Sequence, residues 1–365
     1  MFPYWLLLLM LSAASLFYQR RAHPAAVEWP VISSHRIRSD PALIVALVAI
    51  TLMIGFRYRV GGDWKIYQLH FGWLSQWPLS VGLHRAYEEP GYTFVNWLVG
   101  QVGGGLWLVN LVCAFPFVVG LATLCRQQPN PWLALVVATP LIIIVIGMGY
   151  TRQATALGFL LIGLTGLIGG RSYWWFLAWT LLASLFHQSV LVLIPIVALF
   201  LIRVSVVSVL LLVGAAIVSY YVLLPHALER YSHGYINQVY QAKGAIFRIA
   251  PNAATALLPL IFRKQFATSG TETRILRGWS YLAVAVFAAF FAIRSTVILD
   301  RLSVYIAPLQ VWVWSRLPTA FGEKGRPHLF LTALVIAYSA IVLGLWLAFA
   351  NHARYWLPYQ VYPLL

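Results

Sequence analysis

The sequence predicts an all-α protein, a polytopic bundle of about 12 transmembrane helices. Its 365 residues are 61% hydrophobic and only 9% charged, whereas soluble domains carry about 25% charged residues. Mean hydropathy is +0.80, and apolar runs close to the roughly 17–25 residues that cross a bilayer recur along the chain. Helices satisfy their own backbone hydrogen bonds in lipid, so we expect a single integral membrane domain over residues 1–365.

The predicted spans are the apolar stretches between loops. They cover residues 4–18, 41–56, 105–124, 131–148, 154–168, 173–186, 190–202, 204–224, 252–262, 279–292, 304–314 and 329–349. We interpret the first as a retained span, because Arg20 and Arg21 follow the apolar run, which reverses the order of a signal peptide. Residues 94–102 are expected to form an amphipathic helix on the membrane surface.

Two larger extracytoplasmic loops are predicted, at residues 57–91 and 225–250. This topology puts the N-terminus outside, and the positive-inside rule supports it only weakly, because basic residues are barely in excess on the inner side. The net charge is +16. The Lys and Arg residues are scattered between apolar spans and form no stripe, so we expect no nucleic-acid partner. They remain available to set topology or to bind an anionic ligand such as a lipid phosphate.

The first predicted outer loop contains the acids with the most chemical interest. In "RYRVGGDWKIYQLHF" (57–71), Gly61 and Gly62 allow a tight turn or a close backbone approach to a ligand. Asp63 suits two roles, the N-cap of the next helix and a base or sugar-hydroxyl ligand. In "EEPGYTFVNWL", Glu88 and Glu89 precede a Pro-Gly turn, and ordinary solvated loop acids are the favoured interpretation.

Two further polar residues lie between apolar runs. Arg152, followed by Gln153, is either an interfacial arginine that snorkels or a functional charge near lipid. His187, between two short spans, is more often a packed histidine than a catalyst. The two cysteines, Cys113 and Cys125, suggest neither a disulfide framework nor a metal motif, and we expect no metal ligands.

The segment "AIRSTVILDRLSVY" (292–305) places Arg294, Asp300 and Arg301 at one membrane edge. A local Asp300–Arg301 pair is one interpretation. A diphosphate clamp is the other, because guanidinium groups match phosphate oxygens in a bidentate way. In the predicted topology six candidates fall on the outer side: Asp63, Glu89, Arg152, His187, Arg294 and Arg301.

Several short motifs follow one another along most of the chain. They are "VGGDWKIY" at Val60–Tyr67, "EPGYTFVNWL" at Glu89–Leu98, "RQATA" at Arg152–Ala156, "FHQSVLVLIP" at Phe186–Pro195, "DRLSVY" at Asp300–Tyr305 and "YWLPYQ" at Tyr355–Gln360. In this order the set resembles the EpsG family of Wzy-like exopolysaccharide and O-antigen polymerases. Trp64 departs from the family, where Tyr or Phe is common, and the second outer loop matches no strong pattern.

The resemblance implies a multi-pass enzyme of the cell inner membrane that acts at its outer face. A sugar hydroxyl of the acceptor would attack the anomeric carbon of the donor chain, and polyprenyl diphosphate would leave. The implied partners are polyprenyl-diphosphate-linked oligosaccharide, the lipid bilayer and a separate chain-length regulator. The resemblance implies no cofactor, no metal and no nucleotide sugar.

The residue types suit this chemistry. Arg152, Arg294 and Arg301 are expected to bind the diphosphate, where positive charge opposes the negative charge that develops. The base remains open between His187, Asp63 and Glu89. The expected substrate contacts are Gly62, Trp64, Tyr67, Tyr92, Gln153 and Asp300.

Three other functions remain open. A glycosyltransferase that uses a polyprenyl-phosphate sugar would also place an acid such as Asp63 in the first outer loop. An O-antigen ligase-like enzyme would move a finished chain to another acceptor. A lipid-linked sugar transporter is disfavoured, because the charges lie at span ends rather than in mid-span and the sequence has no internal repeat.

Overall fold

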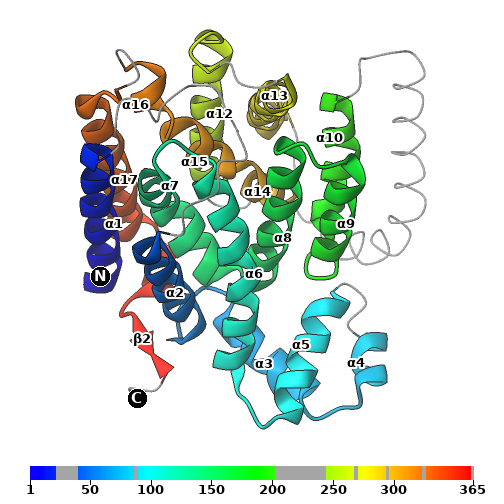
Figure 1. Ribbon diagram of the computed structural model, residues 1–365. Coiled ribbons are helices and arrows are strands. Elements are labelled where there is room, and N and C mark those ends of the chain that lie inside the picture. Colours follow the sequence, from blue (N-terminus) through cyan, green and yellow to red (C-terminus); the bar gives the residue numbers. More distant parts are fainter. Residues whose placement is uncertain are drawn as a thin grey trace. The chain divides into compact units, whose positions relative to one another are not determined.

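The computed structural model describes residues 1–21, 40–85, 89–201, 244–266, 270–292, 296–322 and 326–362. These residues are mostly helical, which confirms the predicted all-α class (Figure 1). They form two compact units. Unit 1 comprises Met1–Gln188 with Gln310–Leu365, and unit 2 comprises Ser189–Leu309. The single integral membrane domain expected for the chain stays a prediction.

Unit 1 contains most of the helices. They are α1 (Phe2–Arg21), α2 (Pro41–Gly55), α3 (Trp64–Leu74), α4 (Leu79–Arg85), α5 (Pro90–Gln101), α6 (Leu106–Arg126), α7 (Pro131–Ala138), the π-helix η2 (Thr139–Gly147), α8 (Thr151–Ile168), α9 (Tyr173–Ser184), α16 (Leu317–Ala320), α17 (Leu329–Phe349) and the 3-10 helix η5 (Ala353–Trp356). Unit 2 contains α10 (Leu193–Leu201), α12 (Ile246–Ile261), α13 (Gly270–Ala292) and α14 (Val297–Ile306). The 3-10 helix η3 (Gln188–Val192) and α15 (Pro308–Trp314) cross the limits between the units.

Within the described residues, six helices are long and apolar enough to cross a membrane. They are Phe2–Arg20, Leu106–Arg126, Thr151–Ile168, Gly270–Ala292, Val297–Trp314 and Leu329–Phe349. Four shorter apolar helices accompany them, at Pro41–Gly55, Pro131–Gly147, Gln188–Leu201 and Ile246–Ile261. These helices indicate a multi-pass membrane protein, while the count of about 12 spans stays a prediction. The span expected at 204–224 and most of the second outer loop lie outside the described residues.

Prolines set the start of three helices in unit 1. Asp40, Asn130 and Glu89 each precede a proline in the first helical turn, where the missing N–H is not needed. Asp40 and Asn130 also cap their helices, because each side chain accepts hydrogen bonds from two backbone amides of the first turn. Glu89 makes no such capping bond, so its carboxylate is available for other partners.

Helix α8 is the buried centre of unit 1. It is buried over 78% of its most apolar 18-residue stretch, against 22% for α17. The backbones of helices α6 and α8 are in close contact. A Cβ added at Gly120 of α6 would lie only 2.0 Å from the carbonyl oxygen of Gly158 in α8. Small residues permit such close crossings of membrane helices. This packing fixes the helix that carries Arg152.

We expect Gly158→Val to destabilise the protein by about 3 kcal/mol or more, because the added Cβ meets backbone atoms that cannot move aside. A Cβ at Gly158 would lie 2.3 Å from the carbonyl oxygen of Pro116. Thermal unfolding of the purified protein in one detergent measures the loss. Gly72→Val is the matched control, since a Cβ at Gly72 meets nothing within 4 Å. Equal unfolding temperatures for the two variants would contradict the close crossing.

A short antiparallel ribbon joins the C-terminal segment to the turn after α2. Strand β1 (Arg57–Tyr58) pairs with strand β2 (Gln360–Val361), and the amide of Gly61 donates to the carbonyl oxygen of Tyr355 at 2.9 Å. The closing motif of the sequence therefore holds the start of the first predicted outer loop.

Of the glycine pair in this turn, Gly61 is the one that the backbone requires. Its φ is +109°, and a Cβ there would lie 2.5 Å from the carbonyl oxygen of Met148, so another residue would be strained and blocked. Gly62 is exposed and a Cβ there meets nothing within 4 Å. Contact between Gly62 and substrate stays a prediction.

Most of the described residues that follow this turn in the first predicted outer loop are helical. Helices α3, α4 and α5 lie together in Figure 1 beside the first turns of α6. The helix expected at 94–102 is present as α5, with Val95 and Val99 buried and Phe94 and Leu98 exposed. Its position on a membrane surface stays a prediction.

Candidate active site

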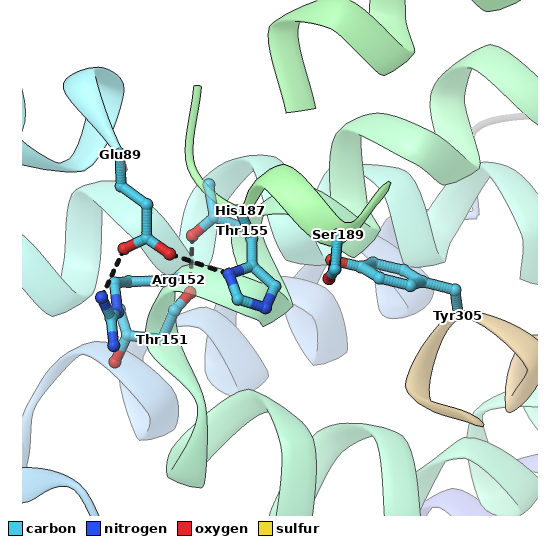
Figure 2. Close-up of polar contacts among 7 residues, drawn as sticks. All are labelled: Glu89, Thr151, Arg152, Thr155, His187, Ser189 and Tyr305. Carbon is cyan, nitrogen blue, oxygen red and sulfur yellow. Dashed lines mark hydrogen bonds and ion pairs between the residues drawn. The ribbon is translucent and has the colours of Figure 1, made fainter. Parts of the chain in front are cut away.

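Three polar side chains from distant parts of the sequence meet in unit 1. Glu89 begins α5, Arg152 lies in the first turn of α8, and His187 follows α9 (Figure 2). One carboxylate oxygen of Glu89, Oε2, accepts a hydrogen bond from Arg152 Nη1 at 2.5 Å, and the other, Oε1, lies 2.8 Å from His187 Nδ1. We call these three residues the Glu89 cluster.

Local structure explains how Glu89 reaches its partners. Glu89 makes no capping bond to the helix that it precedes, and its two carboxylate oxygens contact Arg152 and His187 instead. The amide of Gly91 donates to the carbonyl oxygen of Leu185 at 2.8 Å. This bond joins the start of α5 to the turn after α9, two residues before His187.

The cluster is largely buried. The side chain of Glu89 is 8% exposed, that of His187 14% and that of Arg152 28%. Burial of a carboxylate is costly unless the charge is paired and hydrogen-bonded, and Arg152 supplies both. The interpretation of Glu89 as a solvated loop acid is therefore wrong. Glu88 lies outside the described residues.

The contact with Glu89 selects the tautomer of His187. A carboxylate is an acceptor only, so Nδ1 carries the proton in this contact. The other ring nitrogen, Nε2, is then an acceptor, and it has no hydrogen-bond partner among the residues that the structure describes. This contact fixes the orientation of the ring, and the role of His187 as a base stays a prediction.

Two tyrosine rings flank Arg152. The Arg152 guanidinium carbon lies 5.7 Å from the ring centre of Tyr67 and 6.0 Å from that of Tyr92, within the range of cation–π attraction. Burial raises the pKa of both tyrosine hydroxyls, and the nearby Arg152 charge partly opposes this. Trp64 packs in the same hydrophobic cluster. All three rings are at most 8% exposed, so their stacking on sugars stays a prediction.

Helix α3 brings two more titratable groups near the cluster. Asp63 occupies the N-cap position, as one interpretation predicted, but its side chain makes no capping bond. His70 was not predicted as a site residue. Partial burial lowers its pKa, and the charge of Arg152 lowers it further. The helical spacing of Asp63, Tyr67 and His70, which puts them on one face, is the sequence signal that could have found it.

Sequence reasoning also missed Arg57, which it treated as an ordinary loop residue. The structure buries it to 1% exposure. Its guanidinium donates to the Thr151 hydroxyl at 2.7 Å, directly before Arg152 in the chain. No feature of the sequence distinguishes this arginine from the interfacial basic residues that follow other spans.

The third group of candidates belongs to unit 2. Asp300 accepts a bidentate contact from Arg248 of α12, with Nε and Nη2 each 2.7 Å from a carboxylate oxygen. Sequence reasoning did not predict this partner. Arg294 lies outside the described residues, and ligand contacts of Asp300 and Arg301 stay predictions. In the same unit the Ser189 hydroxyl donates to that of Tyr305 at 3.3 Å (Figure 2).

The structure therefore brings together three of the six residues predicted to share one membrane face, Glu89, Arg152 and His187. Gln153 follows Arg152 in α8 and is 8% exposed, and its contact with substrate stays a prediction. Over the described ranges, no group of three or more His, Cys, Asp or Glu side chains could hold a metal ion.

Apolar helices and an oriented His–Glu–Arg cluster together define a multi-pass membrane protein with an enzyme-like site. The profile of the EpsG family matches residues 42–361. The chain belongs to the EpsG family, as the motifs predicted, and this membership indicates a membrane function of the exopolysaccharide-polymerase kind. Comparison with curated proteins and with solved structures found no match.

Proposed function

We propose that this protein is a polysaccharide polymerase of the Wzy-like kind. It joins polyprenyl-diphosphate-linked oligosaccharide repeat units by glycosyl transfer at the outer face of the inner membrane. The observation that carries the proposal is the Glu89 carboxylate, which holds His187 Nδ1 on one oxygen and Arg152 on the other. Family membership supports the class of reaction.

In this reaction His187 is the general base. Its Nε2 accepts the proton of the acceptor sugar hydroxyl as that oxygen attacks the anomeric carbon of the donor chain. The bond between that carbon and the diphosphate oxygen breaks, and polyprenyl diphosphate leaves with the electron pair. Glu89 holds the ring and stabilises the imidazolium that forms, as a buried carboxylate does for a catalytic histidine.

Arg152 supports departure of the diphosphate. Its guanidinium has five N–H donors, and its side chain is 28% exposed, so donors not used by Glu89 can bind phosphate oxygens. The diphosphate is already a good leaving group, and positive charge rather than a proton is what it needs. The proton taken by His187 is returned to solvent after the product forms.

The geometry ranks the three candidate bases. Both carboxylate oxygens of Glu89 are already engaged, which favours an orienting role. His187 has an available nitrogen and an oriented ring. Asp63 remains the alternative base.

Deletion of the gene, followed by mass spectrometry of lipid-linked glycans, tests the function. We expect single complete repeat units to accumulate on the lipid with no polymer. Repeats that lack one sugar would instead show a monosaccharide transferase that uses a polyprenyl-phosphate sugar. Full-length polymer on its lipid would show a ligase, and an unchanged profile would exclude these enzyme activities in the pathway tested.

In the same strain, we expect Arg152→Ala to abolish polymer while protein level stays intact, because the leaving diphosphate loses its cation. Arg171→Ala is the matched control, since Arg171 lies on the Trp175 ring near the other end of α8 and outside the cluster. Gel analysis of polymer with immunoblotting of the protein makes the comparison. Normal polymer from the Arg152 variant would remove this role.

A further inference from the structure

Arg57 is a buried cation whose partners are all neutral. Its Nη1 donates to the carbonyl oxygen of Ile54 at 2.5 Å, and its Nη2 donates to the Thr151 hydroxyl at 2.7 Å and to Asn110 Oδ1 at 3.1 Å. Among the described residues, no carboxylate forms an ion pair with it. Arg57 Nε and Asn110 Nδ2 are buried without a hydrogen-bond partner in the same set.

Stability does not account for this arrangement. Burial of an uncompensated charge costs several kcal/mol, and apolar replacements of buried ionic groups are often neutral or stabilising. An apolar side chain of similar size would therefore serve the fold at least as well. The charge itself must have another use.

Position points to that use. Thr151, which binds Arg57, directly precedes Arg152 in the first turn of α8. Burial lowers the pKa of Arg57 to about 10, so the group still carries its charge at neutral pH. Charges act strongly on one another in such a poorly screened interior.

The formal charges around Glu89 indicate what the charge of Arg57 adds. Glu89 and Arg152 form an ion pair, and their formal charges cancel. A neutral pair offers a diphosphate little net attraction. Arg57 forms no ion pair with a described carboxylate, so it adds one positive charge beside the neutral Arg152–Glu89 pair.

We propose that Arg57 is a positioning residue that acts through the first turn of α8: it holds Arg152 in place and adds a positive charge behind the Glu89 cluster, which favours the leaving diphosphate. This inference rests on the proposed polymerase function. Arg57 itself does not touch the substrate.

Asn110→Asp separates charge from geometry. Aspartate keeps the oxygen that accepts from Arg57, and the lost amide nitrogen has no partner to lose. The new carboxylate neutralises Arg57 in place. We expect the unfolding temperature to stay or rise, while the transfer rate at saturating substrate falls about tenfold or more. The assay uses purified protein in lipid nanodiscs with synthetic polyprenyl-diphosphate-linked repeat units.

Two substitutions at Arg57 complete the test. Arg57→Met removes the charge and keeps most of the volume, so it should match the loss in Asn110→Asp, whereas Arg57→Lys keeps the charge and should recover most of the rate. Inhibition by inorganic diphosphate should weaken in the same order. Arg316→Met is the matched control, because Arg316 is also buried and donates to Gln128 beyond the far end of α6, and its rate should be unchanged.

The outcomes are distinct. Wild-type rates in Asn110→Asp, or a lysine variant as slow as the methionine variant, would overturn the charge role of Arg57. Equal loss in Arg316→Met would overturn it as well, because any buried arginine would then matter. If the wild-type protein itself forms no polymer from these substrates, the proposed function fails, whatever the variants do.

Discussion

Replacement of His187 with alanine is expected to stop polymer formation while folded protein remains in the membrane. The substitution removes the group placed to take the proton of the attacking hydroxyl, and loss of a general base slows a reaction by about 10²–10⁴-fold. Purified protein in nanodiscs, with rates of repeat-unit transfer and the unfolding temperature measured together, gives the result.

A second histidine of unit 1 is the matched control. His84→Ala changes an exposed histidine of α4 and should leave the rate within about threefold of wild type. His187→Gln tests the oriented base further, because an amide can fill the ring's place but cannot accept a proton. Activity of that variant close to wild type would give the role of base to Asp63.

The helices were predictable because their causes are local. Apolar runs require helical structure in lipid, and the prolines after Asp40 and Asn130 mark helix starts that the structure reproduces. The turn predicted at Pro90-Gly91 was wrong, because these two residues form the first turn of α5. The number of spans was less predictable, because several apolar helices in the chain are shorter than a bilayer needs. Length alone does not separate a short span from a helix buried within the bundle.

The members of the site were predictable, but their pairing was not. Arg152 and His187 attracted interest because polar groups between apolar runs are costly. Glu89 lies 63 residues from Arg152 and 98 from His187, so no spacing rule relates them. The local environment of Glu89, a Pro-Gly turn beside a second acid, suggested solvent. Only the docking of α5 against the end of α9 turns this acid inward.

The buried arginines show the same limit. Arg57 follows a span, as a topology-setting residue does, and its burial depends on Asn110 and Thr151 from two other helices. Arg248 pairs with Asp300 across 52 residues. The sequence shows how many Lys and Arg residues each loop contains. Which of them lose their contact with water is decided by helix packing.

Glu89→Gln is expected to be nearly as damaging as loss of the histidine, even though the two side chains have the same shape. Arg152 Nη1 and His187 Nδ1 both donate to the carboxylate, and an amide has only one oxygen to accept with. The imidazole can adapt by moving its proton from Nδ1 to Nε2. Nδ1 then accepts a hydrogen bond from the amide, and the imidazole can no longer act as a base through Nε2. In the Ser-His-Asp triad, the corresponding change of tautomer lowers kcat about 10⁴-fold.

A double-mutant cycle distinguishes this mechanism from simple loss of stability. If Glu89 acts by orienting His187, then Glu89→Gln combined with His187→Ala should be no slower than His187→Ala alone, because residues that act as a unit are far from additive. Glu89→Asp, which keeps the charge but shortens the reach, should fall between wild type and the amide variant. A Glu89→Gln enzyme with rates near wild type, or losses that simply add in the double variant, would show that the carboxylate does not set the state of His187. The Glu89 cluster would then be a structural ion pair, and the base would have to be sought at Asp63.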